Sequence, residues 1–203
     1  MAKIGLPIKK YCKGIKTMNF KFEKTDLDGL TLITPFCAED ARGYYKKYYE
    51  IATFEAAGLP THYSESSDIF SNYGAVRGLH YQERFSQGKL LHVIHGRIFD
   101  VALDLRQNSK TFGKWKSFEL SGDNLSMLYI PEGFAHGFMS LEDNTYFSYQ
   151  CTGKYDPESC GGILWNDPAL GIPWPITDES RLILTDKDRS WPTFEEYAKE
   201  MLK

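Results

Sequence analysis

The sequence lacks several features that define large classes of protein. No run of apolar residues approaches the roughly 20 that are needed to cross a bilayer, so no membrane partner is expected. The lysines near the N-terminus interrupt the apolar stretch that a signal peptide requires, and we therefore do not expect secretion. The sequence also contains no Walker loop, no G-x-G-x-x-G motif and no nucleophile elbow, and it offers no pattern for those chemistries.

Patterns typical of disulfide frameworks and metal sites are also missing. The cysteines Cys12, Cys37, Cys151 and Cys160 form no C-x-x-C pair, and a chain of 203 residues buries enough surface to fold without cross-links. We therefore expect reduced thiols and a cytoplasmic protein. The segment 131–136 has a P-x-G-x-x-H pattern, but the H-x-H motif that completes this kind of metal site is absent, so no bound metal is expected.

The charges are distributed unevenly along the chain, although the formal net charge is only −3. Residues 1–17 contain five lysines and no acidic residue, whereas residues 18–203 contain 19 basic and 27 acidic side chains. We interpret residues 1–17 as a basic N-terminal extension and residues 18–203 as a single domain. An acidic body is unsuited to general nucleic-acid binding, so no nucleic-acid partner is expected.

Side-chain alternation predicts a mainly β protein. In residues 97–106 every second residue is apolar, which is typical of a strand with one packed face and one polar face that carries Asp100 and Asp104. Several short strands separated by turn residues indicate an antiparallel sandwich or barrel. The other predicted strands are residues 19–22, 30–34, 115–120, 127–130, 134–141 and 145–152.

Two segments predict helices and one predicts a loop. Residues 47–57 have a helix-tolerant composition and end before Gly58, a residue suited to a helix C-cap. Near the C-terminus, Thr193 and Glu196 have the spacing of a capping box, and an apolar helical stripe follows. Residues 64–74 are polar and rich in turn formers, so we expect a loop there.

One segment gathers residues that suit a small anionic ligand. His80 follows Gly78, which permits close approach of another backbone, and Arg77, which can donate two hydrogen bonds to an anion. Lys89 follows shortly and could hold a phosphate or a developing oxyanion. A carboxylate bonded to a histidine fixes its tautomer and raises its basicity. The candidate carboxylates are Asp100, Asp104 and Asp188.

Each of these residues also has a purely structural interpretation. A single histidine in a β protein is often a satisfied core or surface side chain, and Lys89 alone fits a solvated charge at a strand edge. Tyr146 and Tyr149, in the last predicted strand, fit packing within a sheet. The residues alone leave these alternatives open.

Seven segments occur in one order and at characteristic spacings. They are Arg77-Gly-Leu-His-Tyr-Gln, Gln87-Gly-Lys-Leu, Phe99-Asp-Val-Ala-Leu-Asp-Leu-Arg, Thr111-Phe-Gly-Lys-Trp, Ile130-Pro-Glu-Gly-Phe-Ala-His-Gly-Phe, Tyr155-Asp-Pro-Glu and Trp165-Asn-Asp-Pro-Ala-Leu-Gly-Ile-Pro-Trp-Pro. Together, from about Met18 to Trp191, the chain resembles the dTDP-4-dehydrorhamnose 3,5-epimerase family. The resemblance implies a cupin-type antiparallel β-barrel (jelly roll) with short flanking helices and a C-terminal helix. It also implies a homodimer that needs no metal and no cofactor.

The resemblance further implies an isomerase that inverts C3 and C5 of a nucleotide-linked 4-keto-6-deoxyhexose, with dTDP-4-dehydro-6-deoxy-D-glucose as the expected substrate and dTDP-4-dehydro-L-rhamnose as the product. It assigns His80 as the base, Asp188 as its carboxylate partner, Tyr149 as the acid on the opposite face of the sugar, and Lys89 as the cation near the C4 carbonyl. Arg42, expected from the partner subunit, and Arg77 would hold the diphosphate. The other substrate-binding positions that it implies are Lys47, Glu65, Gln82, Asp100 and His136.

Two segments depart from the family pattern at positions that contact the nucleotide base. Lys47 stands where an acid is usual, and Glu65 begins a segment that usually reads Gln-x-Asn-x-Ser. The same chemistry on a GDP- or CDP-linked 4-keto hexose or heptose is therefore an alternative, as is inversion at only C3 or only C5. More distant alternatives are a metal-dependent cupin enzyme, suggested by His136, and a non-catalytic cupin that binds sugar nucleotides.

Overall fold

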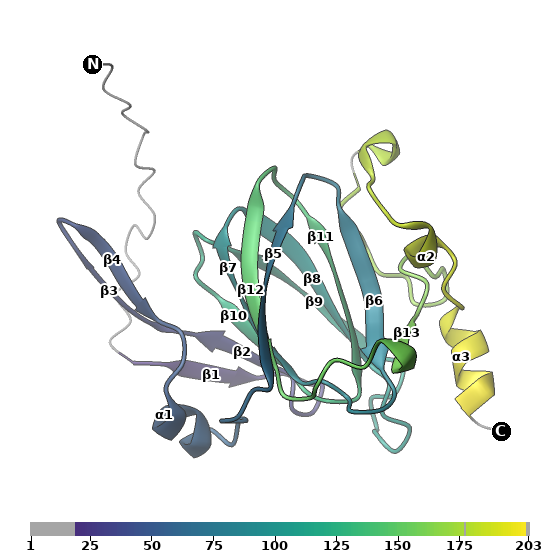
Figure 1. The fold of residues 1–203 in the computed structure, drawn as a ribbon, viewed down its shortest axis with the longest axis horizontal. Coiled ribbons are helices and arrows are strands. Elements are labelled where there is room, and N and C mark those ends of the chain that lie inside the picture. The colour runs from purple at the N-terminus through teal and green to yellow at the C-terminus, as the bar shows by residue number, and fades with distance from the viewer. Residues whose placement is uncertain (1–18, 177, 202–203) are drawn as a thin grey trace.

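Two antiparallel sheets packed face to face form the body of the protein (Figure 1). The computed structural model describes residues 19–176 and 178–201, so the predicted basic extension lies outside the described residues. One sheet has six strands in the order β1-β2-β10-β7-β12-β5, and the other has five in the order β13-β6-β11-β8-β9. This architecture confirms the prediction of a mainly β, antiparallel fold.

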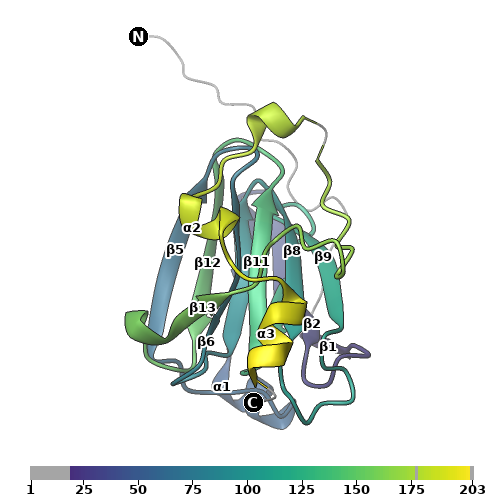
Figure 2. The ribbon, with the colours of Figure 1, turned by 90° about the vertical axis from the view of Figure 1, so that its right-hand side faces the viewer.

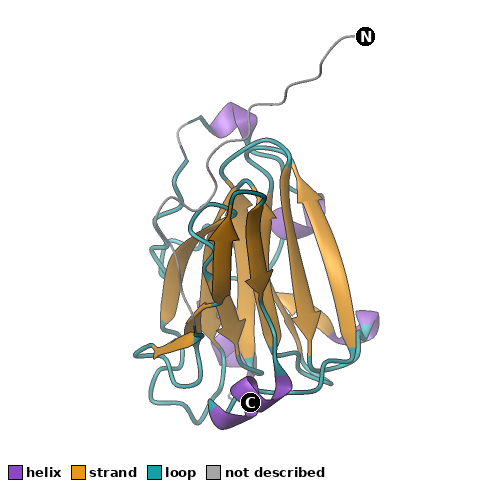
Figure 3. Cartoon of the chain, turned by 90° about the vertical axis from the view of Figure 1, so that its left-hand side faces the viewer, coloured by secondary structure: helices purple, strands orange, loops and turns teal. Residues whose placement is uncertain are grey.

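Strands are the main type of regular secondary structure among the described residues, and the helices lie at the periphery (Figure 3). The six-stranded sheet contains β1 (Lys21–Lys24), β2 (Thr31–Thr34), β5 (Glu65–Ser71), β7 (Lys89–His95), β10 (Met127–Ile130) and β12 (Thr145–Cys151). The five-stranded sheet contains β6 (Val76–Gln82), β8 (Arg97–Asp104), β9 (Trp115–Ser121), β11 (Phe134–Ser140) and β13 (Cys160–Gly162). A separate hairpin is formed by β3 (Phe36–Asp40) and β4 (Gly43–Lys47).

The helices are short. They are α1 (Ile51–Ala56), α2 (Asp186–Arg189) and α3 (Phe194–Met201), with single 3-10 turns η1 (Pro157–Ser159) and η2 (Glu179–Arg181). Within the described ranges, no helix combines the length and the apolar character that a membrane span requires.

Alternation along the strands builds apolar clusters on both sides of the five-stranded sheet. Between the sheets, Ile98 and Phe138 meet Leu91 and Phe147 of the six-stranded sheet in one buried cluster. The outer face of the five-stranded sheet packs against the C-terminal part of the chain, which carries Trp165, Trp174 and Tyr197. Figure 2 shows α2, α3 and the segments that join them lying over this face. One end of the space between the sheets is thus filled with apolar side chains, and the C-terminal segment is fixed to the sheet behind it.

The predicted polar face of β8 is buried instead. Asp100 and Asp104 are both 0% exposed, because the C-terminal segment covers one side of this strand and the opposite sheet covers the other. Asp104 accepts hydrogen bonds from Arg106 Nη2 at 2.8 Å and from the hydroxyls of Ser109 and Thr111 at 2.7 Å each. Although burial acts to raise the pKa of Asp104, these donors lower it to about 2.

The prediction of a loop at residues 64–74 is wrong. Residues Glu65–Ser71 form β5, the edge strand of the six-stranded sheet, and pair with β12 along their whole length. The segment alternates between half-buried and exposed side chains, and its polar residues lie on both faces, with Ser66 and Asp68 exposed and Glu65 and Ser67 half-buried. Pairing with a neighbouring strand outweighs a composition that favours turns.

The predicted helix at residues 47–57 is correct only in its second half. Residues Gly43–Lys47 form β4, and the helix covers Ile51–Ala56. Gly58 follows it with a φ of +71°, as expected at a helix end. The C-terminal helix is confirmed together with its capping box, because Thr193 N donates to Glu196 Oε2 at 2.8 Å and Glu196 N donates to Thr193 Oγ1 at 3.3 Å.

The lowered pKa of Asp104 predicts a pH-dependent contribution to stability. A carboxyl group whose pKa falls on folding stabilises the protein above its unfolded pKa and loses that contribution as the pH falls through the folded value. We expect Asp104→Asn to lower the free energy of unfolding by about 2 kcal/mol at pH 7, and the difference from the unsubstituted protein to shrink between about pH 4 and pH 2.

Urea unfolding measured across this pH range tests the expectation. Asp26→Asn is the matched control, because Asp26 also forms an ion pair, with Lys116 at 2.5 Å, but is exposed to solvent. The control should change the free energy of unfolding much less than Asp104→Asn does, because solvent screens an exposed ion pair. Equal effects of the two substitutions at pH 7 would show that the buried Asp104 network does not stabilise the fold.

Candidate active site

A cavity of about 570 Å³ lies between the two sheets. One wall comes from the five-stranded sheet and carries His80 of β6 and His136 of β11. The opposite wall comes from the six-stranded sheet and carries Lys89 of β7 and Tyr149 of β12. The predicted site residues that line the cavity are Glu65, Arg77, His80, Gln82, Lys89, His136, Tyr149 and Asp188.

His80 forms a close pair with Asp188, a residue 108 positions later in the chain. Asp188 Oδ1 lies 2.5 Å from His80 Nε2, and the aspartate is only 4% exposed. A carboxylate at Nε2 holds a proton on that nitrogen and leaves Nδ1 as the basic nitrogen of the ring. The pair can therefore remove a proton from a bound molecule.

The start of α2 holds Asp188 in place. Thr185 is the N-cap residue, and its hydroxyl accepts a hydrogen bond from Asp188 N at 3.1 Å and donates one to Asp188 Oδ2 at 2.8 Å. Trp191 Nε1 donates to Asp188 Oδ1 at 3.3 Å. Burial acts to raise the pKa of Asp188, but the hydrogen bonds from His80, Thr185 and Trp191 lower it, so the carboxylate stays charged at neutral pH.

A close approach of two strands brings two histidines side by side. His80 and His136 are register partners in the pair of β6 with β11. Gly78 has a φ of +134°, and a Cβ atom there would lie 2.4 Å from Gly137 Cα. Glycine is therefore required at position 78, both for the backbone conformation and for the distance between the strands.

His136 has a carboxylate partner of its own. Asp100 Oδ2 lies 2.8 Å from His136 Nε2, and Asp100 is fully buried behind the histidine rather than in the cavity wall. Its other oxygen, Oδ1, has no hydrogen-bond partner among the described residues. Asp100 thus reaches the cavity only through His136, which it orients.

On the other wall, burial shifts the pKa values of Tyr149 and Lys89 in opposite directions. It raises the pKa of the Tyr149 phenol, with further contributions from Cys151 and Glu65. It lowers the pKa of the Lys89 ammonium, and Cys151, Cys160 and Glu65 offset only part of that effect. A charged group in a poorly hydrated cavity interacts strongly with an opposite charge. Tyr149 therefore remains a proton donor at neutral pH, and Lys89 is suited to an anionic oxygen.

Arg77 and Glu65 lie at the rim of the same cavity. Arg77 is exposed, and its Nη2 donates a long hydrogen bond of 3.4 Å to Phe70 O. Glu65 accepts a hydrogen bond of 2.8 Å from Gln87 Nε2. A free guanidinium face beside the cavity can bind a phosphate.

Arg42 and Lys47 do not line the cavity of the described protomer. Both belong to the hairpin that projects from the body at one side (Figure 1). Arg42 lies at its turn, with a side chain that is 90% exposed, and forms an ion pair with Asp40 at 2.6 Å. Lys47 forms an ion pair with Glu50 at 2.7 Å.

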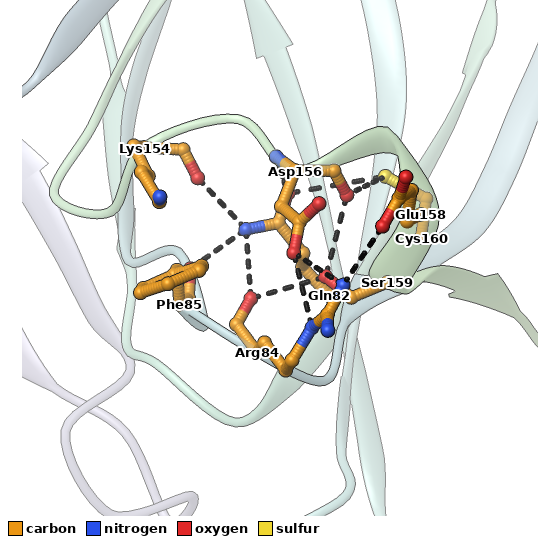
Figure 4. A network of polar contacts seen from close by, with 8 residues as sticks. All are labelled: Gln82, Arg84, Phe85, Lys154, Asp156, Glu158, Ser159 and Cys160. Atoms are coloured by element: carbon orange, nitrogen blue, oxygen red, sulfur yellow. Dashed lines mark hydrogen bonds and ion pairs between the residues drawn. The ribbon is translucent and has the colours of Figure 1, made fainter.

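Gln82 lines the cavity, but its carboxamide is bonded to the protein (Figure 4). Its Nε2 donates to the carbonyl oxygens of Phe85 and Lys154 at 2.8 Å each, and to that of Arg84 at 3.0 Å. Its Oε1 accepts from Asp156 N at 2.9 Å. These contacts differ from the direct substrate contact that the resemblance implied.

Several cavity residues were not identified as site residues from the sequence. Thr185 could have been found, because Thr185-x-x-Asp188 has the spacing of a helix start. Cys160 and Trp191 had no such signal, since only the fold brings their segments against β6. Among the described residues, no group of three or more His, Cys, Asp or Glu side chains is arranged to hold a metal ion.

Comparisons with known proteins agree on one family. The family model described as dTDP-4-dehydrorhamnose 3,5-epimerase matches residues 24–196. The dTDP-4-dehydrorhamnose 3,5-epimerase of Methanothermobacter thermautotrophicus is 45% identical over 177 residues, which are 87% of this chain and 96% of that protein. The Escherichia coli K12 protein of the same name is 41% identical over 175 residues, which cover 85% and 94% of the two chains.

Solved structures give the same result. The epimerase of this name from Elizabethkingia anophelis has a TM-score of 0.83 and 42% identity, with 88% of this chain and 98% of that chain covered. The Legionella pneumophila dTDP-6-deoxy-D-glucose-3,5-epimerase, in complex with dTDP-4-keto-L-rhamnose, has a TM-score of 0.85 and 36% identity, with 90% and 97% covered. The fold is the cupin-like β fold of these sugar-nucleotide epimerases. The chain belongs to the dTDP-4-dehydrorhamnose 3,5-epimerase family, and the predicted resemblance is confirmed.

The close contact between β6 and β11 predicts that one methyl group added at position 78 strongly destabilises the fold. We expect Gly78→Ala to lower the free energy of unfolding by about 3 kcal/mol or more, because its Cβ would overlap Gly137. Gly43→Ala is the matched control, since Gly43 has a similar φ of +127° with no atom within 4 Å of a Cβ there. It should cost only about 1 kcal/mol. Equal losses in urea unfolding would mean that the two strands can separate at little cost.

Proposed function

We propose that the protein inverts C3 and C5 of dTDP-4-dehydro-6-deoxy-D-glucose and thereby forms dTDP-4-dehydro-L-rhamnose. The observation that carries this proposal is the placement of a histidine–aspartate base and a tyrosine on opposite walls of one cavity, His80 with Asp188 on one side and Tyr149 on the other. The Legionella relative binds dTDP-4-keto-L-rhamnose, and a Bacillus anthracis relative binds TDP. Both support a nucleotide-sugar ligand.

The chemistry uses the C4 ketone of the sugar, which acidifies the hydrogens at C3 and C5. His80 takes the proton from carbon, and the C–H bonding pair becomes part of an enolate whose charge lies on the C4 oxygen. Lys89 stabilises this oxygen. Tyr149 then donates its phenolic proton to the same carbon from the other face, and the configuration is inverted. The carbon loses one proton and gains one, so no oxidant or reductant is consumed.

The two imidazoles take different roles in this scheme. His80 is the base because Asp188 leaves its Nδ1 free for a proton from carbon. His136 lies beside it on the paired strand and is oriented by the buried Asp100. We assign His136 to substrate binding, as a hydrogen-bond partner of a sugar oxygen, because it lines the cavity and is the register partner of His80.

The proposal predicts proton exchange with solvent at two carbons. In heavy water, both C3 and C5 of the substrate should take up deuterium, which NMR or mass spectrometry detects. His80→Ala should abolish the exchange, whereas His62→Ala, at an exposed histidine outside the cavity wall, should leave it unchanged. Retained exchange in His80→Ala would remove His80 from the role of base. Exchange at C3 alone would indicate a monoepimerase, the activity named for the 29% identical Streptomyces bikiniensis protein ChmJ.

Tyr149→Phe separates the two proton transfers in the same assay. This variant keeps the base and the packing of the ring, but it loses the phenolic proton. We expect deuterium uptake to continue while inversion is blocked. Full inversion by Tyr149→Phe would show that another group donates the proton.

The nucleotide base is assigned to thymine because the relatives described above act in dTDP-sugar chemistry by name. We expect dTDP to bind at least about tenfold more tightly than GDP, CDP or UDP in a calorimetric comparison. Glu65→Gln removes a negative charge from the cavity and should tighten the binding of all four anions similarly. A preference for GDP or CDP would overturn the assignment, and a changed order in Glu65→Gln would show that Glu65 reads the base.

We further propose a cytoplasmic homodimer in which the hairpin of one protomer reaches the partner's cavity. Free cysteines in the described part of the chain, Cys37, Cys151 and Cys160, support a reducing compartment. The hairpin carries an exposed tyrosine, Tyr45, and the outer face of the six-stranded sheet carries an exposed phenylalanine, Phe70. Exposed aromatic side chains of this kind are typical of interfaces.

Analytical ultracentrifugation tests the assembly, and we expect twice the mass of the chain. Arg42→Ala should weaken dTDP binding by about tenfold without dissociating the dimer, because one charged contact to the diphosphate is lost. Arg97→Ala is the matched control, since Arg97 is also partly exposed and ion-paired but lies outside the cavity wall. A monomeric protein, or unchanged binding by Arg42→Ala, would refute the exchange of hairpins.

A further inference from the structure

We infer that Gln82 is a positioning residue that holds the loop of residues 153–160 against the cavity, and that it acts on substrate binding through Tyr155. The inference rests on the proposed function for the identity of the ligand. Gln82 ends β6, two residues after His80, and is 6% exposed. Figure 4 shows its carboxamide at the centre of a ring of contacts between two loops.

The carboxamide of Gln82 has no capacity left for a ligand. Its two N–H groups are shared among three carbonyl oxygens, those of Arg84, Phe85 and Lys154. Its oxygen accepts from Asp156 N at 2.9 Å and lies 3.8 Å from Cys160 Sγ. A primary amide offers two donors and one oxygen acceptor, so the protein itself satisfies all of them.

These contacts join the turn after β6 to the loop that leads into β13. The two segments approach closely, since a Cβ on Gly153 would lie 2.4 Å from Phe85 O. Further contacts surround the amide. Glu83 N donates to Ser159 O at 3.0 Å, Arg84 pairs with Asp156 at 3.1 Å, and the Lys154 ammonium lies 3.9 Å from the centre of the Phe85 ring. Two buried side chains contact both loops. The Ser159 hydroxyl donates to Arg84 O at 3.2 Å and Asp156 O at 3.3 Å, whereas the Gln82 carboxamide bonds Arg84, Phe85, Lys154 and Asp156 and makes most of the connections.

The loop matters because it supplies part of the cavity wall. Tyr155 and Cys160 line the cavity, and Tyr155 is 61% exposed, so its ring is available to a ligand. Contact with Cys160, followed by burial and a smaller effect of Glu65, raises the pKa of Tyr155. Cys160 and Glu65 line the same cavity as Tyr155. Because the ring of Tyr155 is exposed, its position depends mainly on the backbone of the loop that carries it. Fixing this backbone before binding reduces the entropy lost when the ligand binds.

Loss of the Gln82 contacts should therefore weaken substrate binding more than it slows the chemical step. In Gln82→Leu, three carbonyl groups and one amide N–H lose their buried partner. We expect the Kd for dTDP and the KM for the sugar nucleotide to rise by about tenfold, while kcat changes by less than about threefold. Gln107→Leu is the matched control, because its amide also bonds a backbone carbonyl, that of Met201 at 3.2 Å, far from the cavity.

Gln82→Glu keeps the shape of the side chain and provides a second test. A charged carboxylate would face three carbonyl oxygens, whereas a protonated carboxyl group can donate to one of them. The ratio of its Kd for dTDP to that of the unsubstituted protein should therefore fall as the pH falls from 8 to 5.5. A ratio that is constant over this range would contradict the proposed contacts.

A double substitution tests whether the effect passes through Tyr155. Tyr155→Ala should weaken dTDP binding, and adding Gln82→Leu should then change the Kd by less than about twofold, since residues that act through one another are not additive. Full additivity of the two effects would overturn the inference. A fall in kcat with unchanged KM in Gln82→Leu would also overturn it, because Gln82 would then act on proton transfer.

Hydrogen exchange separates this inference from the proposed function. Without any nucleotide, the amides of residues 154–160 should exchange at least about tenfold faster in Gln82→Leu than in Gln107→Leu. Unchanged protection would refute the positioning role even if dTDP binds well. If the unsubstituted protein fails to bind dTDP, the proposed ligand is wrong, and the exchange rates alone still decide whether Gln82 fixes the loop.

Discussion

The contact between Gly78 of β6 and Gly137 of β11 is the constraint on which the site depends. It lets two strands approach so closely that His80 and His136 become neighbours on one wall. Each imidazole then meets a carboxylate from a different element, Asp188 from α2 and Asp100 from β8. Burying a carboxylate without a partner costs free energy, so each aspartate keeps its hydrogen bond to the histidine. That bond in turn fixes the orientation of the imidazole ring.

On the opposite wall, burial rather than pairing with a carboxylate determines the protonation of the two polar residues. Tyr149 and Lys89 lie on neighbouring strands of the six-stranded sheet, and removal from water acts on both. The neutral form is favoured in each case, which raises the pKa of the phenol and lowers that of the ammonium. One wall therefore contains a base made by a carboxylate, and the other contains a donor kept protonated by its surroundings. In the proposed mechanism, this difference assigns proton removal to the wall of His80 and proton donation to the wall of Tyr149.

Periodicity in the sequence predicted the strands that have an apolar stripe, including β8 and β12, but it failed where that stripe was weak. The strand β5 was missed because polar residues lie on both of its faces and leave no apolar stripe, and because local composition does not show its pairing with β12. Asp100 and Asp104 were expected on a polar face of their strand and are fully buried, since alternation shows which residues share a face and not what covers it. The family pattern could not predict the bonds of Gln82, because they join loops about 70 residues apart.

The pairing of His80 with Asp188 shows the same limit. Spacing cannot relate two residues separated by 108 positions, and only the resemblance to a family linked them before the fold was known. The contact between Thr185 and Asp188 could be predicted from the sequence, because the two residues have the spacing of a helix start. Sequence thus specifies how Asp188 is held within its own turn, while the packing of the C-terminal segment on the five-stranded sheet decides which histidine it meets.

Charge connects these features to the anionic ligand. Residues 18–203 carry more acidic than basic groups, so attraction of a nucleoside diphosphate depends on a few placed cations rather than on the overall field. Within the described protomer, Arg77 and Lys89 line the cavity, whereas Arg42 and Lys47 are ion-paired on the hairpin. Removal from water in the cavity wall lowers the pKa of the half-buried Lys89. A bound anion reverses part of that shift, because a nearby negative charge favours the ammonium form. Binding of an anion and protonation of Lys89 therefore favour each other. In the proposed mechanism, the ammonium form of Lys89 is then favoured in the complex in which it would stabilise the enolate oxygen.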